Sequence, residues 1–449
     1  MSRPAPEIHP MSNVGSATAP TFRNNNNSQF KSTHQKSNLE MNINFQRKVD
    51  RYVGAFICRI FSLFYRKSKD EDDGFQAKKF LVILLSEMGS LVLAYPMFQR
   101  IKKRYPEAEL YGLLFEKNKE VLTLLDVTAP ENILTIRDTA FGAFTIDCLR
   151  VLNRIRKLKV DVVIDCELFA RISSIFSFLS GARIRVGFHP HTQEGLYRGN
   201  FINRPVLFNP YHHMSRQFLT LAAAVDSVGV PKAKQPPGRT NLRAPLIDFA
   251  RDEIDAMQAR LRADFSAVAD KPLVLIYPGG GILPIRAWPR NYYSQVAGEL
   301  IKKGYAVGIV GLEEDRELAS AILSKCNNPA CIDLTGYTHT VRELMLIFQF
   351  AALLITNDGG PGQFAAMTPI PTIIFYGPET PDLYSPVDAK ATIFYNPLPC
   401  SPCLTAYNHR NSACDGDNLC LKQIPPEQVL KTALKILEES ETAPETAAP

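Results

Sequence analysis

The sequence lacks the features of a disulfide-rich, a nucleic-acid-binding or a repeat protein. Its 449 residues contain nine cysteines, too few for the disulfide framework of secreted domains. The net charge is only +6 at pH 7, which favours anionic partners but is too small to indicate binding to nucleic acid. No short internal repeat is visible, which argues against solenoids and propellers. These absences leave an ordinary globular protein of about two or three domains.

The first 40 residues also lack the apolar core of a secretory signal peptide. Their polar composition (NNNNSQFKSTHQKSN) predicts a disordered tail over 1–40 and, with it, a cytoplasmic protein. The last residues, 441–449, have the composition of a second loose tail.

Residues 41–70 contain a short apolar run, VGAFICRIFSLFY, at helical spacing between basic residues. The run is too short to span a bilayer and is interrupted by Arg59. One interpretation is an amphipathic helix that lies in an anionic membrane surface, on the inner face of the membrane. The other interpretation, equally compatible with the pattern, is a helix docked on the body of the protein.

Two regions of similar plan follow, and they predict an α/β protein. Short apolar strands alternate with helices, a pattern typical of parallel sheets covered on both faces. The N-terminal Rossmann-like domain is expected over 78–235, with strands at 79–85, 110–115, 160–166 and 184–188. A proline-rich linker is expected over 236–255. The C-terminal Rossmann-like domain is expected over 256–395, with strands at 273–277, 305–311, 351–356 and 372–376.

The stretch ITNDGGPGQFAA suggests a ligand site in the C-terminal domain. Asp358, Gly359 and Gly360 follow a predicted strand, and Pro361 suits the first turn of a helix of roughly two or three turns. Such a corner suits a phosphate, with the carboxylate available for sugar hydroxyls. The alternative is an Asx turn into an ordinary strand–helix unit.

Two further strand ends carry candidate donor-binding residues. Gly279, Gly280 and Gly281 would let backbone amides approach a phosphate, or they simply form a tight turn. Arg286 can clamp a diphosphate, or it stacks on the neighbouring tryptophan. The acidic pair of Glu313 and Glu314 can bind a ribose diol, or it caps a helix.

Taken together, these motifs resemble glycosyltransferase family 9, the bacterial heptosyltransferases of lipopolysaccharide core assembly. The resemblance covers most of residues 78–440, and it is carried by EMGSLVLAYPMFQRIKKRYPEAEL, VDVVIDCELFARISSIFSFLSGARIRVGF, YPGGG, RAWP, LTGYTHTVRELMLIFQFAALLITNDGGPGQFAA and PTIIFYGPETP. It implies a GT-B fold, in which two Rossmann-like domains face each other across a cleft. It also implies inverting transfer of a sugar from a nucleotide donor to a carbohydrate or lipid-linked acceptor.

The resemblance assigns roles position by position. Asp358 and Gly360 match the family's donor motif, Arg286 stands where a lysine usually contacts donor phosphate, and Glu313 or Glu314 falls near the ribose carboxylate. No metal or cofactor is implied.

Two positions depart from the family pattern. Ser90 follows Gly89 where the family has the aspartate thought to activate the acceptor, so Glu87 is the nearest replacement base. Gln363 stands where a histidine is usual, and it can hydrogen-bond but adds no charge. These departures leave open a binding protein that no longer catalyses. A sugar-nucleotide epimerase of the same fold is a weaker alternative, because the dense acidic and histidine set that it needs is missing.

The segment 396–440 is expected to form a cysteine-containing loop and a C-terminal helix. Cys400, Cys403, Cys414 and Cys420 have the spacing C-x2-C-x10-C-x5-C. Four thiolates this close can hold a structural zinc, although the irregular second spacing favours a reduced or redox-labile loop.

Overall fold

The computed structural model describes residues 48–65, 75–85, 87–168, 170–189, 197–227, 242–281, 283–387, 390–405, 410, 412 and 414–442. The tail expected over 1–40, the first part of the expected linker (236–241) and residues 443–449 lie outside this set. The N-terminal half is defined here as residues 75–227 and the C-terminal half as residues 242–442.

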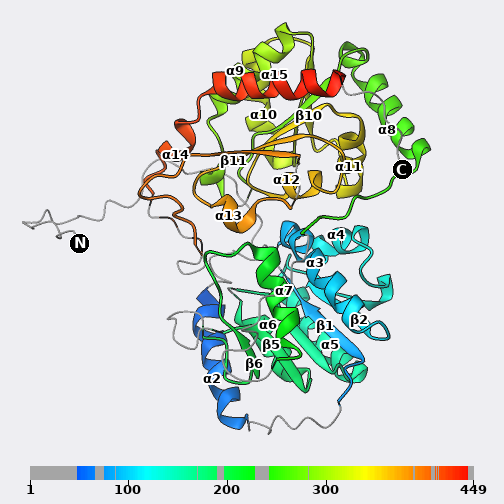
Figure 1. Ribbon diagram of the computed structural model, residues 1–449, viewed down its shortest axis with the longest axis vertical. Helices are drawn as coiled ribbons and strands as arrows, with labels where there is room; N and C mark the ends of the chain where they lie inside the picture. Colours follow the sequence, from blue (N-terminus) through cyan, green and yellow to red (C-terminus); the bar gives the residue numbers. More distant parts are fainter. Residues whose placement is uncertain are drawn as a thin grey trace, which may run out of the picture. The chain divides into compact units, whose positions relative to one another are not determined.

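The N-terminal half contains a six-stranded parallel sheet in the order β3-β2-β1-β4-β5-β6 (Figure 1). Its strands are β1 (Lys79–Ile83), β2 (Glu109–Phe115), β3 (Ile133–Ile136), β4 (Val162–Asp165), β5 (Ile184–Phe188) and β6 (Arg204–Val206). Its helices are α3 (Met88–Arg104), α4 (Lys119–Leu124), α5 (Phe141–Leu158), α6 (Arg171–Leu179) and α7 (Met214–Ala224). The central strand β1 is almost wholly buried, as its continuous apolar sequence predicts.

The C-terminal half repeats this order in a second parallel sheet, β12-β11-β10-β7-β8-β9. Its strands are β7 (Leu273–Tyr277), β8 (Ala306–Gly311), β9 (Cys331–Thr335), β10 (Leu353–Asn357), β11 (Thr372–Tyr376) and β12 (Ala391–Tyr395). Its helices are α8 (Arg251–Asp264), α9 (Arg290–Lys302), α10 (Arg316–Cys326), α11 (Val341–Phe350), α12 (Gly360–Ala365), α13 (Pro381–Tyr384), α14 (Leu419–Lys422) and α15 (Pro426–Thr442). Both sheets have the Rossmann strand order, so the predicted pair of Rossmann-like domains is confirmed.

Helix α8 begins at Arg251, inside the segment expected to be linker. Its first turn carries Asp252 and Glu253, and the Glu253 carboxylate accepts a hydrogen bond from the Ala250 amide at 3.2 Å. This acidic start suits a helix N-terminus, and it was hidden in the sequence by the polar composition around it.

The two halves contact each other at several places. The Glu120 carboxylate, from α4, accepts hydrogen bonds from the Val341 and Arg342 amides at the start of α11, at 3.0 and 2.9 Å. The His213 ring, just before α7, lies 2.8 Å from the Ser385 carbonyl oxygen. Helix α3, which follows β1, contacts α12, which follows β10, so the carboxyl ends of these two central strands lie near one another.

A helical segment before the first sheet packs on the N-terminal half. It consists of one π-helical turn, η1 (Asp50–Gly54), and α2 (Ala55–Phe64). Cys58 is fully buried, and the Phe61 ring stacks on Phe178 of α6 at 4.8 Å. Docking on the body of the protein is therefore confirmed for the inner face of this segment. Among the described residues, no helix is both long and apolar enough to cross a membrane.

Candidate active site

The corner after β10 holds Asp358 in a buried position. Pro361 lies in the first turn of α12, as predicted, but the helix has only six residues and is shorter than expected. The Asp358 side chain is 9% exposed and forms an ion pair with Arg286 at 3.4 Å. Burial raises the pKa of Asp358, and the guanidinium groups of Arg286 and Arg410 oppose that rise. The corner therefore holds a buried, charged pair.

The glycine loop after β7 is built for close backbone approach. A Cβ on Gly280 would lie 2.7 Å from the Leu283 carbonyl oxygen, and Gly281 has a φ of +59°. Arg286 donates to the Gly280 carbonyl at 3.4 Å. Within the described residues its Nε is buried and has no hydrogen-bond partner, which suits a group that awaits an anionic ligand. Trp288 instead stacks on Phe375, at 4.4 Å.

Asn357, which sequence reasoning missed, joins the two donor-side corners. Its Nδ2 donates to the carbonyls of Pro278 and Gly279 at 3.1 and 2.9 Å. Its Oδ1 accepts from the Trp288 amide at 2.8 Å and from the Tyr293 hydroxyl at 2.9 Å. The side chain is fully buried, so the glycine loop and the Asp358 corner form one unit.

The acidic residues after β8 differ in where their side chains lie. Glu313 and Glu314 are exposed, and Glu313 pairs with Arg316 at 3.1 Å. The next residue, Asp315, turns back toward the glycine loop, where a Cβ on Gly279 would lie 2.8 Å from its Oδ1. Asp315 is thus the carboxylate that lies closest to the loop, and sequence reasoning did not select it.

Glu87 lies at the N-cap of α3, after the first strand, and both its carboxylate oxygens have donors. The Ser90 hydroxyl donates to Oε2 at 2.7 Å, and Arg410 pairs with Oε1. Burial alone would raise the pKa of Glu87, but Arg410 and Ser90 together lower it below its usual value. Glu87 is therefore ionised at neutral pH.

Arg410 links the two halves of the molecule. Besides Glu87 of the N-terminal half, it contacts Glu379 of the C-terminal half at 3.3 Å, and it lies over the Tyr384 ring at 5.4 Å. Burial raises the pKa of Glu379 to about 8, although Arg410 opposes the rise. Arg410 lies in none of the motifs identified in the sequence, and Glu379, although it lies within PTIIFYGPETP, was not selected as a site residue.

Gly89 and Gln363 meet where the halves approach. A Cβ on Gly89 would lie only 2.9 Å from the Gln363 Cγ. The Gln363 Nε2 donates to the Tyr384 carbonyl at 2.7 Å, while its Oε1 is buried without a hydrogen-bond partner among the described residues. The predicted acceptor-side and donor-side residues are thus brought together.

A small cavity of about 30 Å³ lies between the halves at this point. Its lining residues are Leu84, Glu87, Ser90, Cys166, Glu167, Leu168, Met214, Phe218, Tyr384 and Arg410. Apolar walls surround two carboxylates and one guanidinium, an arrangement that strengthens electrostatic interactions inside the cavity.

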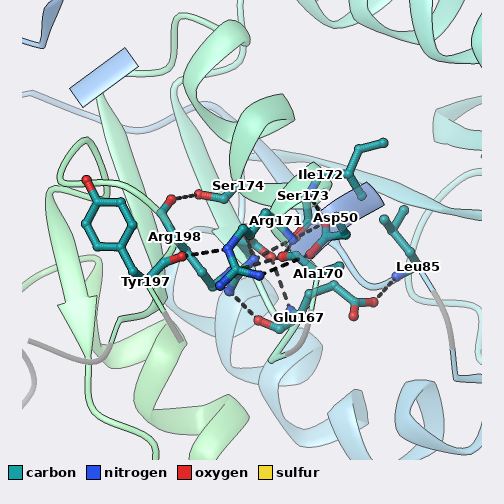
Figure 2. Close-up of polar contacts among 11 residues, drawn as sticks. Asp50, Leu85, Glu167, Ala170, Arg171, Ile172, Ser173, Ser174, Tyr197 and Arg198 are labelled. Carbon is teal, nitrogen blue, oxygen red and sulfur yellow. Dashed lines mark hydrogen bonds and ion pairs between the residues drawn. The ribbon is translucent and has the colours of Figure 1, made fainter. Parts of the chain in front are cut away.

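Glu167, also missed by sequence reasoning, follows β4 and is held by a buried network (Figure 2). Its Oε1 accepts a hydrogen bond from the Leu85 amide at 2.6 Å. Its carbonyl accepts from Arg198, which also pairs with Asp165. Burial, with the neighbouring Asp165 and Glu87 carboxylates, raises the pKa of Glu167 to about 7.

The four clustered cysteines all lie in the described part of the chain. Cys400 and Cys414 are exposed, whereas Cys420 is buried. The Cys403 sulfur lies 3.1 Å from the Ser412 hydroxyl. Within the described ranges, no group of three or more histidine, cysteine or acidic side chains is arranged to hold a metal ion.

Comparison with known proteins identifies this arrangement. The family model of glycosyltransferase family 9 (heptosyltransferase) matches residues 148–413, more than half of the chain. The chain belongs to glycosyltransferase family 9. It is a glycosyltransferase, as its sequence motifs predict.

Individual relatives agree with the family assignment. Lipopolysaccharide heptosyltransferase 2 of Salmonella typhimurium is 25% identical over 368 residues, which cover 80% of this chain and 99% of the relative. The solved structure of E. coli ADP-heptose lipopolysaccharide heptosyltransferase II has a TM-score of 0.64 at 20% identity, covering 81% of this chain and all of that one. The E. coli heptosyltransferase WaaC, solved with ADP, has a TM-score of 0.55 at 13% identity, covering 79% of this chain and 99% of that one. At these identities the solved structures support the GT-B fold.

Proposed function

We propose that this family 9 member transfers a heptose from ADP-heptose, with inversion, to a sugar of a growing lipopolysaccharide core. The donor and the pathway come from the names of its relatives. The observation that carries the proposal is the cavity between the halves, where the Glu87 carboxylate lies opposite the charged groups of the C-terminal half. A base and a phosphate-binding site must face each other in this way for transfer between two bound sugars.

In the proposed reaction, Glu87 takes the proton of the acceptor hydroxyl as its oxygen attacks the anomeric carbon. The electron pair of the broken C–O bond leaves with the ADP diphosphate. Arg286, with its unpartnered Nε, and the amides of Gly279, Gly280 and Gly281 stabilise the negative charge that develops there. The Ser90 hydroxyl orients the Glu87 carboxylate through its 2.7 Å hydrogen bond.

The donor assignment covers Asp358, Gly359, Gly360 and Gln363, with Glu313, Glu314 or Asp315 at the ribose. The glycine loop and the Asp358 corner share Asn357, so the sites for phosphate and sugar are preformed as one unit. Gly89 and Ser90 remain on the acceptor side.

A thermal-shift experiment tests the donor site. ADP-heptose at about 100 times its Kd should stabilise the protein by about 2.7 kcal/mol, which raises Tm. Arg286→Ala should lose most of this shift, because the diphosphate loses its clamp. Arg262→Ala, which removes an exposed arginine from α8, is the matched control and should keep it. An Arg286→Ala protein that is stabilised as strongly as wild type would contradict the assignment.

A binding protein without catalysis is the second candidate, and the ion pair between Glu87 and Arg410 favours it. A carboxylate held by a guanidinium is a weaker base, so transfer requires that substrates loosen this pair. The two candidates differ in turnover, not in donor affinity.

We also propose that the protein acts at the cytoplasmic face of the membrane, through the η1–α2 segment. Its outer face exposes Tyr52, Val53, Phe56, Leu63 and Phe64, and the exposed Arg51 and Arg59 lie in the same segment. Apolar side chains beside cations suit an anionic lipid surface, where a lipid-linked acceptor would be found.

A further inference from the structure

Two carboxylates from neighbouring strands line the cavity between the halves. Glu87 follows β1 and Glu167 follows β4, and these strands pair in parallel, with Ile83 opposite Asp165. The carboxyl ends of paired parallel strands meet at one edge of the sheet, so both side chains reach the same small space. The proposed reaction uses only Glu87, and the presence of Glu167 in this cavity needs an explanation.

The buried Arg198 side chain holds the backbone at Glu167. Arg198 pairs with Asp165. It also donates to the Ser173 hydroxyl at 2.6 Å (Figure 2). Its ion pair is therefore made with Asp165, while the Glu167 carbonyl takes one further hydrogen bond from it. The Glu167 side chain is left pointing to the cavity, with Oε1 fixed by the Leu85 amide.

The N-terminal segment secures the same loop from the other side. The Asp50 carboxylate of η1 accepts hydrogen bonds from the Arg171 and Ile172 amides, at 2.7 and 3.2 Å, and so caps α6. The N-cap residue of α6 is Ala170, which has no side chain able to do this. Asp50 thus holds the start of α6, while Arg198 holds the Glu167 carbonyl.

The two cavity carboxylates differ in basicity. Glu87 has a donor on each oxygen and a pKa below its usual value, so it holds a proton poorly. Glu167 has a pKa of about 7, raised by burial and by the Asp165 and Glu87 carboxylates, while Arg198 opposes the rise. Arg410, Tyr384 and the Cys166 thiol, whose pKa burial raises well above its usual value, also face this cavity. A pKa near the working pH suits a group that accepts a proton during turnover.

We propose that Glu167 is a second catalytic carboxylate, which forms with Glu87 a pair that takes the proton of the acceptor hydroxyl in this cavity. This inference rests on the proposed transferase function. The O–H bond of the acceptor breaks, its electron pair forms the new bond to the anomeric carbon, and the diphosphate leaves with the electrons of the old bond. Glu87 takes this proton and passes it to Glu167, where it ends, so that Glu87 is again ionised beside Arg410. The pair titrates as a unit, so its protonation controls the rate.

The dependence of kcat on pH tests this inference. Wild-type kcat should fall below an apparent pKa near 7, because a protonated pair cannot accept a second proton readily. Glu167→Gln keeps the shape and the hydrogen bond from Leu85, so the protein should stay folded. This variant should lower kcat at pH 8 at least tenfold. It should also move the acid limb of the pH profile, which is the fall in kcat toward low pH, to a lower pH.

Glu107→Gln is the matched control, since Glu107 is an exposed carboxyl on the loop after α3 and does not line the cavity. It should leave the pH at which kcat falls unchanged. An unchanged pH profile in Glu167→Gln, or a profile that moves equally in Glu107→Gln, would overturn the inference. If the glutamine variant does not fold, Glu167→Asp serves in its place: it should keep the limb but lower kcat, and normal kcat would count against the proposal. A wild-type protein without any turnover would mean that the transferase function itself has failed.

Discussion

The ionisation of Glu167 changes the free energy of unfolding of the protein. Glu167 is 6% exposed, and its pKa of about 7 lies above the ordinary 4.5, so the folded protein binds its proton more tightly than the unfolded chain. The contribution of protonated Glu167 to the free energy of unfolding is fully present below pH 4.5, and it is lost as the pH rises through 7. An ionised Glu167 therefore costs about 3 kcal/mol at pH 8.

Glu167→Gln should consequently raise Tm at pH 8 and change it little at pH 4, since the amide never ionises. Thermal unfolding followed by circular dichroism at both pH values measures this. Glu107→Gln, at an exposed position on the loop after α3, should change Tm at neither pH. A variant that is less stable than wild type at pH 8 would show that the carboxylate is structural.

Helices and strands differ in how far the sequence predicts them. The buried central strands were predictable because most of their side chains on both faces are apolar, and β11 was predicted to the residue. The strands β3, β6, β9 and β12 were missed, and all four are edge strands only three to five residues long. β6 contains Pro205, and β12 is half-exposed, so neither carries the continuous apolar pattern.

The site was predictable only where a local motif carries it. Asp358 and the three glycines follow strands, Arg286 lies a few residues beyond the glycine loop, and these residues do converge. Arg410 and Glu167 reach the site through contacts with residues far away in the sequence, such as the pair of Arg410 with Glu87 and the network around Arg198. Such contacts cannot be predicted from the periodicity or the spacing of residues in the sequence.

The η1–α2 segment makes a prediction at the level of one element. Phe56→Ser combined with Leu63→Ser should weaken binding to vesicles of anionic lipid, because both side chains lie on the exposed apolar face. Wild-type binding should fall as salt rises. Point substitutions are preferable to truncation, since removal of α2 would uncover Phe178 and Phe201.

Phe141→Ser is the matched control for vesicle flotation. Phe141 is 63% exposed on α5, close to the 61% of Phe56, so it has equal apolar area outside the segment. Its substitution should leave vesicle binding unchanged. Equal binding by wild type and the double variant would remove this segment from membrane contact.

We expect turnover to depend on the close approach of the two halves at Gly89. Gly89→Ala would place a methyl group 2.9 Å from the Gln363 Cγ, so the Gln363 side chain or the helices α3 and α12 must shift. We expect kcat to fall several-fold and donor affinity to fall less, because Gln363 is the donor residue that the new methyl group meets. Steady-state kinetics with separate donor titration measures both quantities.

A double-mutant cycle shows whether this loss comes from the contact itself. Adding Gln363→Ala removes the side chain that the new methyl group meets, so Gly89→Ala should cost less in that background. Gly142→Ala is the control, since a Cβ there has no neighbour within 4 Å. Equal costs in both backgrounds would locate the effect elsewhere.

Transfer by the wild-type protein and by Glu87→Gln is the most direct test of the central claim. The protein is incubated with ADP-heptose and a lipopolysaccharide acceptor truncated in the core, and the mass of the acceptor and the release of ADP are followed together. The account predicts one added heptose per ADP released. It also predicts that Glu87→Gln lowers turnover by ~10²–10⁴-fold, with donor affinity unchanged. A wild-type protein that binds ADP-heptose but leaves the acceptor mass unchanged would contradict the account and favour the binding protein.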